Sequence, residues 1–145
     1  MHADTPYCVE ARHSSDRCVR LQDGRFHLVR PGPLCHLFHG SEYILASEAL
    51  ADVLRETCAD CLDLRRTEVI QVVTGEIFGI YYEVSPHDEF TPADVGRVHA
   101  SGFHAWHFHR TDLFVSPKVA ETISQRGFDD ISFSQEFSRF AGAVA

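Results

Sequence analysis

Two cysteines three positions apart are the most obvious candidates for chemistry. The segment Cys58-Ala59-Asp60-Cys61 is a CxxC pair, and this spacing allows two thiolates to hold one zinc ion at a helix end. A structural zinc site requires further ligands, for which Cys8 and Cys18 are distant candidates. The alternatives are a redox dithiol or two buried thiols, because free cysteines behave as small apolar residues.

The histidine-rich segment 104–109 is the second candidate. A strand here would place alternate residues on one face, namely His104, Trp106, Phe108 and Arg110. His107 and His109 would share the other face with the spacing of two metal ligands, but a catalytic zinc ion needs a third protein ligand. If His104 and Trp106 are partly exposed, they would anchor a partner protein, because tryptophan buries a large area with little loss of entropy. The alternative is that the aromatic residues fill the core.

Acidic residues form the third candidate. Glu83 is followed by Asp88, Glu89 and Asp94 in a polar stretch punctuated by prolines, which predicts an exposed loop. Loops present binding residues without burying their backbone, and carboxylates gathered there would complement a basic surface and speed association with it. The alternative is an ordinary solvated loop. We predict that six residues contact a partner protein: Glu83, Asp88, Glu89, Asp94, His104 and Trp106.

Familiar catalytic motifs are absent from the sequence. It contains no Gly-x-Ser-x-Gly elbow, no His-Glu-x-x-His helix and no glycine-rich phosphate loop. No nucleophile is therefore paired with a base in a recognisable pattern. We expect a protein that is not an enzyme and that uses no metal or other cofactor.

Composition narrows the class of partner. The length of 145 residues is near the commonest size of one domain. The net charge of −8, with histidines neutral, repels nucleic acids and anionic membranes. No apolar run reaches the roughly 20 residues that cross a membrane, and the first six residues lack the features of a secretory signal. Five cysteines, an odd number, fit a reduced compartment. We expect a cytoplasmic protein that binds another protein.

An internal repeat supplies the elements that position these residues. The pattern of residues 43–64 recurs at 112–133 with a constant offset and no gap. Each copy has an apolar strand that ends in a serine, then a short helix with apolar residues at helical spacing, and then a second strand. We predict that Ser47 and Ser116 are helix N-caps.

The two copies differ at the end of the helix. Gly127 suits the left-handed conformation just past the last turn of the second helix, whereas Cys58 occupies the corresponding place in the first copy. The first helix must therefore end differently or serve another purpose. Because the shared residues have a structural explanation, function is to be sought in what the copies do not share.

The remaining segments predict hairpins and a loop. Residues 18–21 and 25–29 flank Asp23-Gly24, and residues 69–73 and 77–84 flank a turn at 74–76. Residues 85–98 are expected to form a surface loop with one helical turn from Thr91-Pro92, and residues 103–110 a further strand. The prediction is a single α+β domain with a largely antiparallel sheet and two short helices.

The repeat resembles immunity proteins of bacterial polymorphic toxin systems over roughly residues 43–135. The resemblance lies in the repeated unit, with Gly127-Phe128-Asp129 after the second helix, and in Tyr81-Tyr82 with an acidic loop between the copies. The chain is also similar to myxobacterial double-CxxCG proteins, although Leu62 follows its single CxxC. The resemblance implies a small cytoplasmic protein that binds and neutralises a cognate toxin delivered by a neighbouring cell, without catalysis.

Two hypotheses follow for the function. In the first, an immunity protein occludes a basic toxin active site with its acidic loop and the neighbouring sheet face. In the second, a small zinc-binding protein or metal-dependent enzyme uses Cys58 and Cys61 or the strand from His104 to His109. Bound metal in the purified protein would distinguish the second hypothesis from the first.

Overall fold

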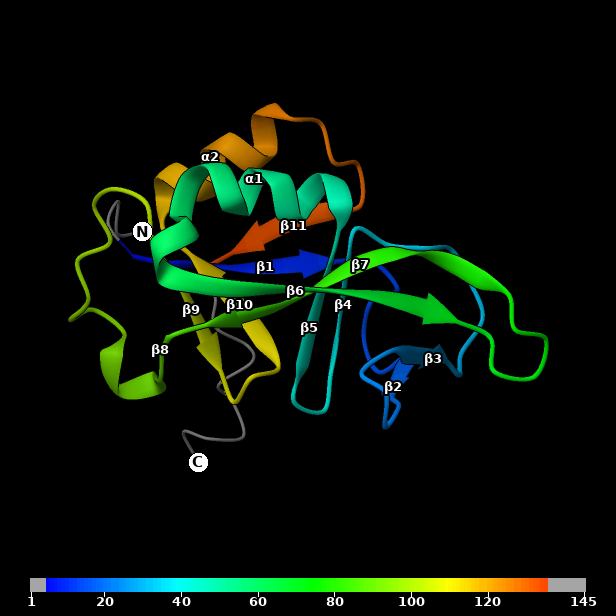
Figure 1. Ribbon diagram of the computed structural model, residues 1–145. Helices are drawn as coiled ribbons and strands as arrows, with labels where there is room; N and C mark the ends of the chain where they lie inside the picture. The colour runs from blue at the N-terminus through cyan, green and yellow to red at the C-terminus, as the bar shows by residue number, and fades with distance from the viewer. Residues whose placement is uncertain (1–4, 136–145) are drawn as a thin grey trace.

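Two helices lie across two sheets in the computed structural model, which describes residues 5–135 (Figure 1). Helix α1 spans Glu48–Cys58 and helix α2 spans Pro117–Gln125. Each buries one apolar stripe, formed by Leu50, Ala51, Val53, Leu54 and Cys58 in α1 and by Val119, Ala120 and Ile123 in α2. Within the described part of the chain, neither helix is long and apolar enough to cross a membrane.

The strands form a six-stranded and a five-stranded sheet. The first has the order β2-β3-β6-β7-β5-β4, with β2 Cys18–Arg20, β3 Phe26–Leu28, β4 Leu37–Gly40, β5 Tyr43–Ser47, β6 Leu62–Ile70 and β7 Ile77–Pro86. The second has the order β11-β1-β10-β9-β8, with β1 Tyr7–Ala11, β8 Asp88–Glu89, β9 Ala105–Phe108, β10 Asp112–Val115 and β11 Ile131–Ser134. All pairings are antiparallel except β3 with β6 and β8 with β9. The predicted single α+β domain is confirmed, with two sheets in place of one.

Both predicted copies of the repeat are present, as β5-α1-β6 and β10-α2-β11. The strand registers show that the repeated unit includes one more strand. Strand β7 lies between β5 and β6, and β1 lies between β10 and β11. Ala46 faces Tyr82 in the first sheet, just as its counterpart Val115 faces Tyr7 in the second. The other neighbour agrees, because Leu64 faces Val84 and its counterpart Phe133 faces Val9. Strand β7 therefore corresponds to β1, and both contain the pattern Tyr-x-Val.

The hairpins that precede the helices are also equivalent. Leu37 faces Ala46 in the β4-β5 hairpin, and Ala105 faces Val115 in the β9-β10 hairpin. This register superimposes two segments with the pattern His-x-aromatic-His, namely His36-Leu37-Phe38-His39 and His104-Ala105-Trp106-His107. The β9-β10 turn has one residue more than the β4-β5 turn. This extra residue hides the relation from an alignment without gaps.

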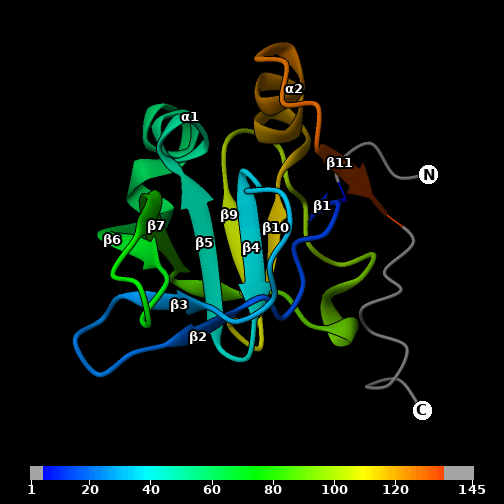
Figure 2. The ribbon, with the colours of Figure 1, turned by 90° about the vertical axis from the view of Figure 1, so that its right-hand side faces the viewer.

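The two copies exchange their first strands. In chain order, β1, β4, β5, α1 and β6 form one copy, and β7, β9, β10, α2 and β11 form the other. Because β7 lies within the sheet of the first copy and β1 within that of the second, neither sheet is complete without a strand from the other half. Figure 2 shows α1 above the six-stranded sheet and α2 above the five-stranded sheet.

Three apolar clusters form the core. The largest lies beneath both helices and takes residues from both copies, among them Leu54, Val84 and Ile123. A second cluster on the six-stranded sheet contains Phe26, Phe38 and Tyr81, and a third on the five-stranded sheet contains Phe90, Trp106 and Phe114. Central strands are thus covered on both faces. This is why Tyr81 and its neighbour Tyr82, on opposite faces of β7, both pack against apolar clusters.

Both predicted serines occupy the N-cap position, but only Ser47 makes the side-chain cap bond. Ser47 Oγ accepts a hydrogen bond from the Leu50 N–H at 3.2 Å. Ser116 is fully buried, and its hydroxyl donates to the Gly102 carbonyl at 2.7 Å and accepts from the His104 N–H at 3.0 Å. The prediction of a side-chain cap at Ser116 is wrong, because a connecting segment competes for its hydroxyl.

The helix ends and hairpins follow the predictions. Gly127 has a positive φ of 77° just beyond α2, as expected of a glycine there. Helix α1 instead continues from Cys58 into the 3-10 turn η1 (Ala59–Cys61). Both hairpins form, although the second reaches from Leu62 to Pro86 and is longer than predicted. Thr91 begins the 3-10 turn η2 (Pro92–Asp94) as expected.

Candidate functional site

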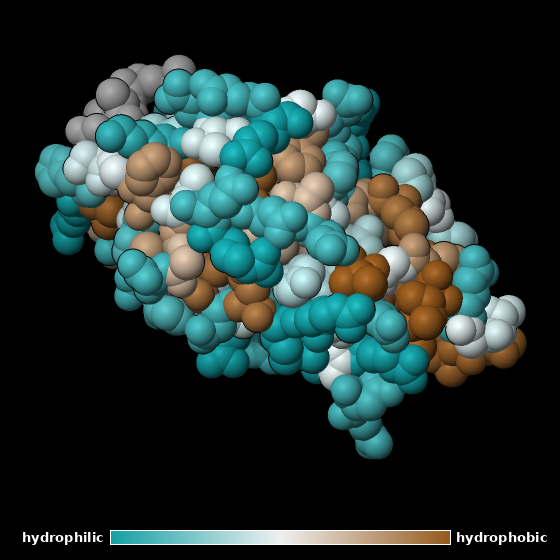
Figure 3. Space-filling model, turned by 45° about the horizontal axis from the view of Figure 1, so that its top comes forward, coloured by the Kyte–Doolittle hydropathy of each residue, from teal (hydrophilic) through white to brown (hydrophobic). Residues whose placement is uncertain are grey.

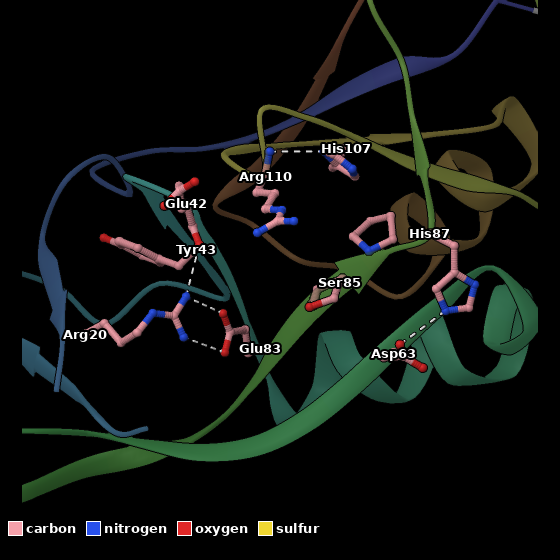
Figure 4. A pocket seen from close by; sticks show the side chains of 11 residues that line it. Arg20, Glu42, Tyr43, Asp63, Glu83, Ser85, His87, His107 and Arg110 are labelled. Atoms are coloured by element: carbon pink, nitrogen blue, oxygen red, sulfur yellow. Dashed lines mark hydrogen bonds and ion pairs between the residues drawn. The ribbon is translucent and has the colours of Figure 1, made fainter. Parts of the chain in front are cut away.

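A cleft of about 400 Å³ lies where the two copies meet. Strand β7 runs along one side and continues into β8, so the chain passes there from the first sheet to the second. The β4-β5 turn contributes Glu42 and the β9-β10 turn contributes Arg110. Figure 4 shows the Arg110 guanidinium pointing into the cleft, toward Ser85. The walls are mostly charged or polar side chains.

Glu83 lies in β7 and joins the cleft to the body of the protein. Its carboxylate accepts two hydrogen bonds from Arg20, at 2.9 and 2.6 Å, and one from Arg65 at 2.7 Å. Burial raises the pKa of Glu83, but the hydrogen bonds from both guanidinium groups outweigh this effect and lower it. The prediction that Glu83 belongs to an exposed loop is wrong, since its side chain is 13% exposed and its charge is neutralised.

His107 lies on the other side of the cleft and holds the β9-β10 turn. Its Nδ1 atom accepts a hydrogen bond from the Arg110 N–H at 3.0 Å. His109 and Arg110 both have positive φ values, 53° and 57°, which non-glycine residues adopt at an energetic cost. Burial lowers the pKa of His107 and so favours the neutral ring that accepts this bond. The turn that positions Arg110 is therefore strained, and Glu42 in the β4-β5 turn on the same cleft also has a positive φ, of 60°.

The predicted acidic residues occupy three different environments. Asp88 and Glu89 form β8 at the edge of the five-stranded sheet, and the Asp88 side chain is 62% exposed. Asp88 pairs with His104 at 3.0 Å, and Glu89 pairs with His109 at 4.0 Å. Asp94 instead completes a capping box, because its carboxylate accepts from the N–H and hydroxyl of Thr91. Glu83 makes its hydrogen bonds to Arg20 and Arg65 and not to β8. The four carboxylates therefore do not form one surface.

The predicted aromatic anchor is buried. Trp106 is 7% exposed and packs in the third core cluster with Phe108, so the alternative of core aromatics is correct for both residues. A neighbouring aromatic residue, Phe103, is 50% exposed. It lies beside Lys118, whose Nζ is 5.9 Å from the ring centroid. The exposed aromatic side chain of this segment is therefore Phe103, one residue before His104.

His104 connects residues from separate parts of the chain. Its ring stacks on Trp106 at a centroid distance of 4.4 Å. Its Nε2 atom lies 3.0 Å from Asp88 Oδ2, and its Nδ1 atom lies 3.2 Å from Cys61 Sγ. In the sequence, Cys61 and His104 belong to different candidate sites. The constant offset of the repeat pairs Cys61 with Asp130 and does not join it to His104, so the contact could be found only from the packing of the two copies.

Metal ligands do not gather in the described part of the chain. Between residues 5 and 135, no three His, Cys, Asp or Glu side chains are placed to share a metal ion. Cys8, Cys18 and Cys58 belong to three different core clusters, so the proposed distant ligands lie apart from the CxxC pair. His109 is in a turn and does not share a strand face with His107. All five cysteines are free thiols.

Hydrophobic side chains are exposed at the far end of the molecule. Val72, Val73 and Ile77 lie at the tip of the β6-β7 hairpin, and Val73 is 88% exposed. Hydrophobic surface gathers at this end in the space-filling view, whereas the surface over the helices is largely hydrophilic (Figure 3). The acidic edge and the apolar tip are thus separate features.

Comparison with known proteins gives no relative: neither a family model, nor a curated protein, nor a solved structure matches the chain.

Proposed function

We propose that this chain is a bacterial immunity protein, which binds a cognate toxin in the cytoplasm and blocks its active site. The observation that carries the proposal is the acidic edge formed by Asp88 and Glu89 in β8. Both carboxylates are exposed, and in residues 5–135 each has an ion pair only with a histidine. Histidine carries a charge only when protonated, so these partners cancel less negative charge than lysine or arginine would.

The surroundings of this edge suit a protein partner. Asp63 lies nearby on the cleft, with a largely exposed carboxylate that pairs with His87 at 3.3 Å. The exposed ring of Phe103 adds apolar area, which interfaces commonly bury at their centre within a polar rim. The net charge of −8 favours encounter with a basic surface. A toxin that acts on nucleic acids or nucleotides would present such a surface, and the resemblance of the repeat to immunity proteins agrees with this partner.

The first test is binding to the toxin domain encoded beside this chain. Calorimetry should detect a one-to-one complex, and co-expression should protect a sensitive cell. The variant D88K/E89K should bind at least about tenfold more weakly, with most of the loss at low salt, because charges at an interface rim act on association. Asp94 is left unchanged because its carboxylate caps η2.

A matched control separates the acidic edge from net charge. The variant E76K/E121K makes the same change in charge at two exposed positions away from β8 and should retain wild-type affinity. If both double variants bind as tightly as wild type, the acidic edge is not the contact surface. If the wild-type protein forms no complex with the adjacent toxin domain, the immunity proposal is wrong.

A further inference from the structure

Three side chains of different chemistry meet at the end of η1. Cys61 supplies a thiol, His104 a base and Asp88 a carboxylate, and they come from η1, the segment before β9, and β8. His104 Nδ1 lies 3.2 Å from Cys61 Sγ, and His104 Nε2 lies 3.0 Å from Asp88 Oδ2. A nucleophile, a base within hydrogen-bond reach and a third group that orients the base form the usual arrangement for activating a weak nucleophile.

The carboxylate determines which nitrogen faces the thiol. In the tautomer protonated at Nε2, His104 would donate a hydrogen bond to Asp88, and its Nδ1 lone pair would face Cys61. When Nδ1 takes the thiol proton, Asp88 lies beside the resulting imidazolium ion and stabilises it. Cys61 is the one cysteine of the five that is not buried, which favours it over the others for reaction with a reagent from solvent.

The other copy shows what the same place does without this chemistry. His36 corresponds to His104, and its Nδ1 atom lies 2.7 Å from the hydroxyl of the cap Ser47. Asp130 corresponds to Cys61 and accepts a hydrogen bond from the backbone N–H of His36 at 2.9 Å. In the second copy Ser116 binds backbone groups instead, which leaves the His104 ring to Cys61 and Asp88. The repeat thus supplies a structural histidine in one copy and a thiol-facing histidine in the other.

We propose that Cys61 is an activated thiol that exchanges with low-molecular-weight disulfides and carries the resulting mixed disulfide. His104 Nδ1 takes the proton of the Cys61 thiol, and the thiolate attacks one sulfur of the small disulfide. The S–S bond of the reagent breaks as the new S–S bond to Cys61 forms. The departing thiolate takes the proton from His104, so one disulfide and one thiol enter and one disulfide and one thiol leave.

The remaining cysteines are poorly suited to this reaction. Cys8, Cys18, Cys35 and Cys58 are all buried. Burial raises the pKa of Cys58 to about 11 and that of Cys18 to about 12, which keeps these thiols protonated and unreactive. Cys58 is the nearest cysteine to Cys61 in the chain. Because it is buried and protonated, it is a slow resolving thiol, and the mixed disulfide on Cys61 should persist.

The test is incubation of the purified full-length protein with glutathione disulfide at neutral pH, followed by intact-mass and peptide mass spectrometry. We expect one glutathione per chain, located on Cys61 and absent from C61S. The H104Q variant should react at least about tenfold more slowly, and D88N should react several-fold more slowly. The H36Q variant is the matched control, because it changes the equivalent histidine of the other copy and should react at the wild-type rate.

Several outcomes would overturn the proposal. These are modification of another cysteine, formation of an internal disulfide in place of the adduct, or equal rates for H104Q and wild type. If H104Q does not fold, as judged by circular dichroism, the D88N variant still tests the proposal, because Asp88 is largely exposed. An unchanged rate in folded D88N would contradict the proposed role of Asp88 and His104 in activating Cys61. The reaction needs no toxin, so its result is independent of the proposed immunity function.

Discussion

Glu83 shows how a residue that looks like a surface acid from the sequence can be part of the framework. Its carboxylate joins Arg20, at the end of β2, to Arg65 in β6. Three strands are thereby held at one point on the edge of the cleft. A bidentate guanidinium pair of this kind fixes geometry as well as adding stability.

Replacing Glu83 with glutamine should therefore destabilise the protein. We expect E83Q to lower the free energy of unfolding by about 1–3 kcal/mol at pH 7, because both arginines lose a charged acceptor. Urea denaturation followed by circular dichroism would measure the change. The control E76Q, at an exposed turn residue, should be close to neutral. If E83Q is as stable as wild type, the two arginines lose their charged acceptor at no cost in the free energy of unfolding, and the prediction is wrong.

The same substitution gives a defined pH dependence. The folded pKa of Glu83 is lowered, so its stabilising effect is present above the unfolded value of about 4.3. The effect is lost as pH falls from there through the folded pKa. The difference in unfolding free energy between wild type and E83Q should consequently shrink from pH 7 to pH 3. A difference that stays constant over this range would contradict the assignment.

At the scale of elements, the two helix starts use equivalent serines in different ways. Ser47 caps α1 and contacts the His36 ring. Ser116 is buried between α2 and the segment that leads into β9, where it bonds to the Gly102 carbonyl and the His104 N–H. One serine therefore stabilises a helix terminus, and the other ties a long connection to the sheet.

Alanine substitutions should separate these roles. S47A should cost about 1 kcal/mol, as is typical for the loss of an N-cap. S116A should cost more, at about 1–3 kcal/mol, because it removes a fully buried hydroxyl and leaves the partly buried Gly102 carbonyl and His104 N–H without their partner. Chemical denaturation of both variants would measure the order, with S124A on the exposed face of α2 as a neutral control. If S47A proved the more damaging, the contacts of Ser116 would be of little energetic value.

Local elements could be predicted from the sequence, but their long-range partners could not. Both helices, both hairpins and the Gly127 end follow from periodicity and turn chemistry. The His-x-aromatic-His relation escaped because the β9-β10 turn has one extra residue. Trp106 could be assigned to the core or to the surface only after Phe90 and Phe114 were seen beside it. The contact of Cys61 with His104 depends on the packing of two copies, which no local pattern reports.

At the scale of the whole molecule, the exchanged strands bind the halves together. Strand β7 pairs along its length with β6 and also with β5, and β1 pairs with both β10 and β11. Each half thus contributes a central strand to the sheet of the other. Separation of the halves would break four strand pairings and open the shared core beneath the helices.

A chain cut between the halves should therefore stay assembled. A protease site inserted at Thr74-Gly75, in the exposed β6-β7 turn, would give two fragments after cleavage. We expect them to elute together from a sizing column in native buffer and to separate only in denaturant. The control is an otherwise identical site between Gln22 and Asp23, in the β2-β3 turn. It would show how the protein responds to cleavage in a turn that does not separate the halves. Fragments that separate in native buffer would contradict the exchange.

The exchange also determines when the protein can first fold during synthesis. Strand β1 leaves the ribosome long before both of its neighbours, β10 and β11, which lie near the other end of the described residues. The five-stranded sheet cannot form around β1 until β10 and β11 have emerged, and contacts between such distant segments form slowly. In a truncated polypeptide that lacks β10 and β11, β1 would lose both of the strands with which it pairs. Such a product would be a substrate for cellular quality control, so the active pool should contain only chains in which β10 and β11 are present.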